Sequence, residues 1–110
     1  MAYWARGKHL LSLGCPQEAV EAFQEGLRCE ETIARAKGED PSKLEAVSGG
    51  LLNSRAFLGL AKVKSGDRSG ESLLEDSLGI LSKRAEHGEG EMKEDAQVYR
   101  DQIQESIKRN

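Results

Sequence analysis

Residues 2–29 read AYWARGKHLLSLGCPQEAVEAFQEGLRC, a pattern typical of two antiparallel helices joined by a tight turn. Apolar or small residues recur three and four positions apart in both halves, which is the spacing of one helical face. They are Tyr3, Gly7, Leu10 and Leu11 in the first half and Ala19, Phe23, Gly26 and Leu27 in the second. Pro16 suits a first helical position but not a helix interior, so we place the turn at Gly14 and Cys15. The second helix is expected to continue to about Lys37.

The composition favours a single all-helical domain. The chain has 110 residues, enough for one domain with a modest core. Charged residues make up 32% of it and aromatic residues 5%, which suits well-solvated helices better than strands. The net charge is −3, and acidic and basic residues are interspersed. Without the clustered basic side chains that a phosphate backbone requires, we expect neither a nucleic acid nor an anionic membrane as a partner.

Two further absences bear on the compartment. The sequence has no apolar run near the roughly 20 residues of a membrane helix, and no charged-then-apolar leader. We therefore expect a cytoplasmic protein.

The two cysteines also indicate a cytoplasmic protein. On one helix, with about 1.5 Å of rise per residue, Cys15 and Cys29 would lie roughly 20 Å apart. A disulfide needs Cα atoms within about 7 Å, so we expect two free thiols, which fit a reducing compartment. Their spacing is also wrong for a pair of metal ligands, and we expect no metal and no other cofactor.

A long third helix is expected over residues 41–65. Asp40 would be its N-cap, and apolar residues on two of its faces predict packing on two sides. Gly49 and Gly50 each cost about 1 kcal/mol in a helix interior. The helix therefore either bends or breaks at these two glycines, and the sequence leaves both outcomes open.

Two more helices complete the expected set, from about Ser69 to Glu86 and from about Glu89 to Lys108. The last helix carries one apolar stripe, formed by Met92, Ala96, Tyr99, Ile103 and Ile107. A helix with one apolar face can close a stack of helices but cannot lie in its middle. We expect it to pack on the third and fourth helices as a cap.

The order of small and aromatic residues in the first two helices resembles a tetratricopeptide repeat. The matching positions are Gly7, Gly14, Ala19, Phe23 and Gly26. Residues 58–81 resemble a second copy, in which Gly59 answers Gly7, although Asp76 stands where Phe23 stands in the first. The interval between the two glycines is well above the about 34 residues of a standard repeat, so the pair is divergent and elongated.

This resemblance implies an all-α solenoid of antiparallel helix hairpins in one domain, residues 1–110. Residues 1–37 would form the first repeat, 41–87 the second and 89–109 a capping helix. It also implies an adaptor or scaffold that binds a peptide or helix of a partner protein in a concave groove. The groove residues implied are Trp4, Lys8, Leu11, Ser12, Asn53, Ala56, Leu60 and Lys64. Trp4 equally suits a packing role in the core.

No residues have the arrangement of a catalytic site. His9 and His87 lie far apart in sequence, and neither is near a cysteine or carboxylate motif. Adjacent acidic pairs such as Glu94 and Asp95 point to different faces of a helix, which does not suit a shared proton or metal. We therefore expect no enzymatic activity and assign no catalytic residue.

Two alternatives remain open. The chain could be a structural module without a ligand, which forms a homodimer or part of a longer repeat array; the mass of the particle in solution would distinguish it from an adaptor. Small three-helix modules that dock on transport-machinery tails also begin much like residues 5–27. Those modules do not account for the second copy at residues 58–81.

Overall fold

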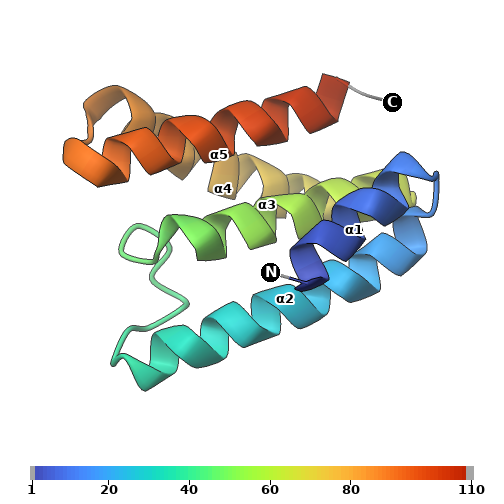
Figure 1. The fold of residues 1–110 in the computed structure, drawn as a ribbon, viewed down its shortest axis with the longest axis horizontal. Helices are drawn as coiled ribbons and strands as arrows, with labels where there is room; N and C mark the ends of the chain where they lie inside the picture. Colours follow the sequence, from blue (N-terminus) through green and yellow to red (C-terminus); the bar gives the residue numbers. More distant parts are fainter. Residues whose placement is uncertain (1, 109–110) are drawn as a thin grey trace.

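The computed structural model describes the backbone of residues 2–108 and the side chains of residues 4–108. This part of the chain contains five helices and no strand. The helices are α1 (Ala2–Ser12), α2 (Pro16–Ala36), α3 (Gly49–Lys64), α4 (Gly70–His87) and α5 (Gly90–Lys108). The all-helical prediction is confirmed for these residues (Figure 1). The predicted positions of the Tyr3 side chain and of Arg109 lie outside the described part.

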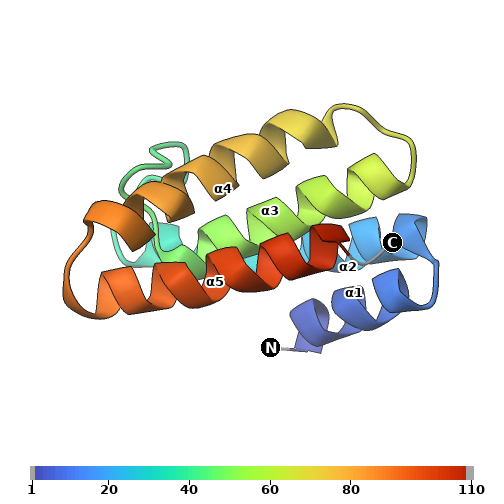
Figure 2. The same cartoon turned by 90° about the horizontal axis from the view of Figure 1, so that it is seen from above.

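Helix α3 lies at the centre of the molecule. It packs against α2 on one side and against α4 and α5 on the other, and α1 packs on α2 (Figures 1 and 2). Successive helices run in opposite directions. Most of α3 is buried: Leu51, Leu52, Asn53, Ser54, Ala56, Phe57, Leu58, Gly59, Leu60 and Ala61. The predicted packing on two sides is therefore confirmed, and α5 adds a third neighbour.

Three aromatic side chains join α1, α2 and α3. Phe23 and Phe57 are almost fully buried, and their rings stack with centroids 5.5 Å apart. Trp4 meets Phe57 edge-on at 6.0 Å. A Cβ atom at Gly7 would lie 2.6 Å from the Phe23 ring, so α1 lies this close to α2 because position 7 has no side chain. Gly7 and Phe23, which belong to the apolar faces identified in the sequence, therefore meet across the two helices.

The long third helix expected over residues 41–65 is wrong in its first part. Residues 39–48 form turns, and α3 begins at Gly49. Ser48 is its N-cap, because the Ser48 hydroxyl oxygen accepts a hydrogen bond at 3.2 Å from the backbone N–H of Leu51. The two glycines therefore begin a helix and do not interrupt one, so the structure shows neither the bend nor the break.

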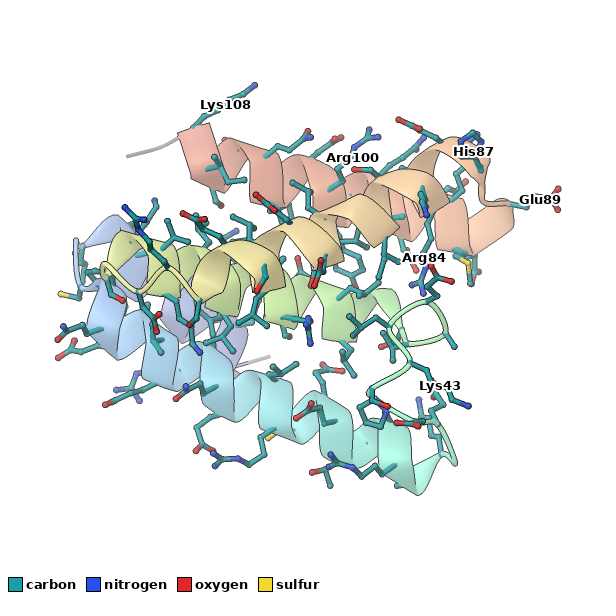
Figure 3. All side chains as sticks on the ribbon, turned by 180° about the vertical axis from the view of Figure 1, so that it is seen from behind. Lys43, Arg84, His87, Glu89, Arg100 and Lys108 are labelled. Atoms are coloured by element: carbon teal, nitrogen blue, oxygen red, sulfur yellow. The ribbon has the colours of Figure 1, made fainter. Side chains whose placement is uncertain are left out.

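Asp40 closes a turn instead of capping a helix. Its carboxylate accepts hydrogen bonds from the backbone N–H of Ser42 at 2.9 Å and from the Ser42 hydroxyl at 2.7 Å. Such local bonds compete with helix formation. Val47 anchors the segment in the core, at 2% exposure. Arg84 reaches it from α4 and donates to the backbone carbonyl of Glu45 at 2.9 Å (Figure 3).

Helix α5 covers α4 and α3, as predicted from its single apolar stripe. Ala96 and Ile103 are buried, and Tyr99 and Ile107 are partly buried against the core. Met92, the first residue of the predicted stripe, is instead 57% exposed in the first turn of the helix. The covering surface of α5 therefore begins at Ala96.

Candidate functional site

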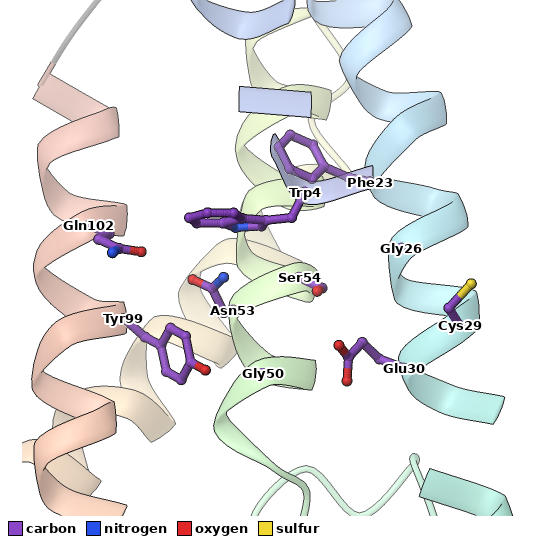
Figure 4. A pocket seen from close by; sticks show the side chains of 10 residues that line it. All are labelled: Trp4, Phe23, Gly26, Cys29, Glu30, Gly50, Asn53, Ser54, Tyr99 and Gln102. Carbon is purple, nitrogen blue, oxygen red and sulfur yellow. The ribbon is translucent and has the colours of Figure 1, made fainter. Parts of the chain in front are cut away.

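A cavity of about 250 Å³ opens between α2 and α5, with α3 as its floor (Figure 4). It exists because α1 has 11 residues and α2 has 21, so α1 covers only the first part of its partner. The second half of α2 faces α5 across α3. The cavity is lined by Trp4 from α1, by Phe23, Gly26, Cys29 and Glu30 from α2, by Gly50, Asn53 and Ser54 from α3, and by Tyr99 and Gln102 from α5.

Three buried polar atoms that line the cavity have no hydrogen-bond partner among the described residues: Trp4 Nε1, Asn53 Oδ1 and Gln102 Oε1. Asn53 is 4% exposed, so bulk water does not readily reach its amide. Leaving a buried polar group unpaired costs about 1–3 kcal/mol, and most such groups in folded proteins are paired. The indole N–H is a donor and the two amide oxygens are acceptors. These three atoms therefore offer one donor and two acceptors to an incoming molecule.

Glu30 gives the cavity a negative charge. Its carboxylate faces the start of α3, since a Cβ atom at Gly50 would lie 3.7–3.9 Å from the carboxylate atoms. No basic side chain is among the described residues that line the cavity. Burial raises the pKa of the Tyr99 phenol, and the carboxylates of Asp95 and Glu30 raise this pKa further. The phenol therefore stays neutral at physiological pH, and its surroundings favour a cation.

Aromatic rings form the apolar walls. Trp4, Phe23 and Tyr99 line the cavity from three different helices. The Lys8 ammonium lies 4.5 Å from the centroid of the Trp4 ring, which helps to hold the indole in place. A Cβ atom at Gly49 would lie 2.9 Å from the Tyr99 ring, so that glycine lets Tyr99 rest on the start of α3. Apolar walls with a few converging polar groups are typical of ligand sites.

The eight residues of the predicted groove fall into three groups. Trp4 and Asn53 line the cavity. Ala56 is fully buried and Leu60 is 3% exposed, because neighbouring helices cover this part of α3, so both belong to the core and line no open surface. The other four border a separate hollow beside the C-terminal half of α1: Lys8, Leu11, Ser12 and Lys64.

Eight of the ten residues that line the cavity were outside the predicted groove, and three of these bring oxygen-bearing side chains from helices that the prediction did not include. Glu30, Tyr99 and Gln102 come from α2 and α5, whereas the resemblance assigned the groove to the first helix of each repeat. Tyr99 belongs to the predicted apolar stripe of α5, and Gln102, three positions further on, shares its face of the helix. That spacing is the signal that could have found them.

Cys29, at the wall of the cavity, and Cys15, at the N-cap of α2, both carry free thiols. Within the described residues, no group of three or more potential metal ligands comes together. The same part of the chain contains no helix with the length and apolar character needed to cross a bilayer.

No family model, curated protein or solved structure matches this chain. The resemblance to tetratricopeptide repeats therefore rests on the residue pattern alone, and the function has to be argued from the chain's own residues.

Proposed function

We propose that this chain is a peptide-binding helical module, an adaptor that takes a side chain of a partner protein into the cavity between α2 and α5. The observation that carries the proposal is the set of three unpaired polar atoms in one open, apolar-walled cavity. A peptide presents backbone N–H and C=O groups next to each side chain, so it can pair with such atoms while its side chain fills the apolar space.

The size of the cavity favours a peptide over a larger organic ligand. Pockets for drug-sized molecules usually hold about 300–1,000 Å³. At about 250 Å³ this cavity is smaller, which suits one side chain and its flanking backbone. The proposal assigns the protein no reaction.

We further propose that the module is an elongated relative of the tetratricopeptide type. Each of its two helix hairpins has a glycine at the closest approach of its helices. In the first, Gly7 faces the Phe23 ring. In the second, a Cβ atom at Gly59 would lie 2.6 Å from the carbonyl oxygen of Gly70. In this proposal α5 is the closing helix and also supplies one wall of the binding site.

A peptide-display selection tests the proposal. Random peptides are selected on the wild-type protein and then measured on Gly50→Leu, whose added side chain fills the cavity from its floor. Gly79→Leu is the matched control, because a Cβ atom at Gly79 meets nothing within 4 Å and its helix lies outside the cavity. We expect the selected peptides to bind the wild type and Gly79→Leu equally, and to bind Gly50→Leu at least tenfold more weakly.

Two outcomes would contradict the proposal. If the selected peptides bind Gly50→Leu as tightly as the wild type, the cavity is not the binding site. If no peptide is enriched and the wild-type particle has the mass of a dimer, the self-associating structural module is the better description.

A further inference from the structure

We propose that the side chain taken into the cavity is an arginine of the partner, with its guanidinium paired with the Glu30 carboxylate. This inference rests on the proposed peptide-binding function and names the chemistry of its ligand.

The hydrogen-bonding groups of the cavity match a guanidinium. The acceptors that line the cavity include the unpaired amide oxygens of Asn53 and Gln102 and the Glu30 carboxylate. A guanidinium has five N–H donors in a fixed plane and no acceptor. The three acceptors come from three different helices, α3, α5 and α2, around one space (Figure 4). An arginine within a peptide carries donors on its guanidinium and on the flanking backbone N–H groups, so the guanidinium can pair with Glu30 while N–H groups meet the amide oxygens. A lysine ammonium offers three donors at a single point and lacks the planar fork that matches a carboxylate.

Charge and shape favour the same ligand. Glu30 is the one carboxylate among the described residues that line the cavity, and no basic side chain lies beside it in that lining. A neutral or acidic side chain would leave that charge without a counter-charge. Trp4 and Tyr99 offer aromatic rings, on which a planar guanidinium stacks well.

Trp4 explains why the arginine belongs to a peptide. Its Nε1–H is a buried donor with no partner, and a guanidinium cannot accept a hydrogen bond. A backbone carbonyl beside the arginine residue can. The cavity thus recognises an arginine together with one flanking peptide group.

Nuclear magnetic resonance on the intact protein tests this inference. Trp4 is the sole tryptophan, so its single indole N–H resonance reports on the cavity. The probe is N-acetyl-arginine methylamide, and the matched control is the citrulline compound, a neutral near-isostere; the lysine compound tests the preference for a planar cation. We expect arginine to shift the Trp4 resonance saturably, and the citrulline compound to bind at least tenfold more weakly.

Two substitutions sharpen the test. Glu30→Gln removes the charge with little change of shape and should weaken arginine binding at least tenfold. Glu21→Gln is its control, an exposed residue on the same helix that does not line the cavity, and should change nothing. Gln102→Glu adds a second carboxylate and should tighten arginine binding several-fold without helping citrulline.

The outcomes separate this inference from the proposed function. Equal binding of arginine and citrulline, or unchanged arginine binding by a folded Glu30→Gln protein, overturns the inference. If the display selection still returns peptides that lack arginine and are blocked by Gly50→Leu, the peptide-binding function stands without it. If no peptide is enriched and none of the three compounds moves the Trp4 resonance, both fail.

Discussion

Gly7 and Gly79 both lie within helices, but an added methyl group would meet very different surroundings at the two positions. At Gly7 it would lie 2.6 Å from the Phe23 ring, which is packed on Phe57 and cannot easily move. At Gly79 it would meet nothing within 4 Å. Substitutions at the two positions therefore distinguish the close packing that a glycine allows from the low helix propensity that a glycine brings.

We expect Gly79→Ala to stabilise the protein by up to about 1 kcal/mol, because alanine is the better helix former. Gly7→Ala gains the same helix propensity but must push α1 away from α2, which costs about 1–3 kcal/mol. Urea unfolding of both variants measures the two effects against the wild type. A stable Gly7→Ala protein would mean that the contact with Phe23 is looser than described.

Tyr99 predicts how stability depends on alkaline pH. Because burial and the nearby carboxylates raise its folded-state pKa above the usual value of about 10, the folded protein holds the phenolic proton more tightly than the unfolded chain does. This contribution is complete below pH of about 10 and is lost as the pH rises through the folded-state pKa. Wild-type stability should therefore fall more steeply than that of Tyr99→Phe as the pH rises above about 10, as followed by urea midpoints. Parallel curves would contradict the assignment.

Single residues were also where sequence interpretation succeeded least. Phe57, fully buried and in contact with both Trp4 and Phe23, was not in the expected core, because it lies outside the two apolar faces that the sequence predicted for this helix. Trp4 and Asn53 were placed at a binding surface and do line the cavity.

At the start of α3, a local capping interaction determines where the helix begins, although the apolar periodicity extends further toward the N-terminus. The apolar spacing continued through residues 41–65 and predicted one helix over that range. In the structure the hydrogen bond between the Ser48 hydroxyl and the backbone N–H of Leu51 caps a helix that begins only at Gly49. A serine followed by two glycines is compatible with a cap, but the sequence alone does not say whether the glycines interrupt a helix or begin one. The ends of the other helices were placed within a residue or two, since Gly14, Gly38 and Gly66 mark them with positive φ.

Ser48→Ala should remove the cap and destabilise the protein by about 1 kcal/mol. Ser72→Ala is a suitable control, because Ser72 is exposed in the first turn of α4 and caps nothing there. Thermal unfolding followed by circular dichroism measures both. If the two variants melt together, the capping bond at α3 contributes nothing to stability.

Helix α5 should be required for the stability of the rest. Truncation after Gly88 removes Ala96 and Ile103, which are buried, and uncovers parts of α3 and α4. Burying each large apolar side chain is worth about 1.5–3 kcal/mol, so we expect a strongly lowered melting temperature and self-association, measured by calorimetry and light scattering.

Point substitutions within α5 provide the control for that truncation. Ile103→Ala should cost about 2–5 kcal/mol, whereas Val98→Ala, at a side chain that is 54% exposed, should cost little. A truncated chain that stays monomeric and keeps its melting temperature would show α5 to be a detachable docking segment.

In the whole molecule, α3 is the central helix and the other helices pack around it. Helices α2, α4 and α5 all pack on it, and residues 51–54 and 56–61 are buried. Sequence analysis found the number and type of helices because each carries its own periodicity. It did not find the cavity, because that space depends on how far α1 extends along α2 and on where α5 lies, and neither is written in a local pattern.

Hydrogen exchange should follow this arrangement. Amides of α3 should exchange most slowly, since their exposure requires the separation of several helices, and those of α1 and residues 39–48 most quickly. Mass spectrometry of peptides from the native protein checks the order. Exchange in α3 as fast as in α1 would mean that α3 is not the central element.

The contact between Gly59 and Gly70 limits which substitutions this sequence can accept while it retains its fold. A Cβ atom at Gly59 would lie 2.6 Å from the Gly70 carbonyl oxygen and 2.7 Å from the Leu74 backbone nitrogen, and one at Gly70 would press on the backbone of α3. Because the obstruction is main chain and not a flexible side chain, no rotamer change relieves it. Descendants of this chain that retain the α3–α4 crossing should retain both glycines together, or lose both in lineages where the two helices have moved apart.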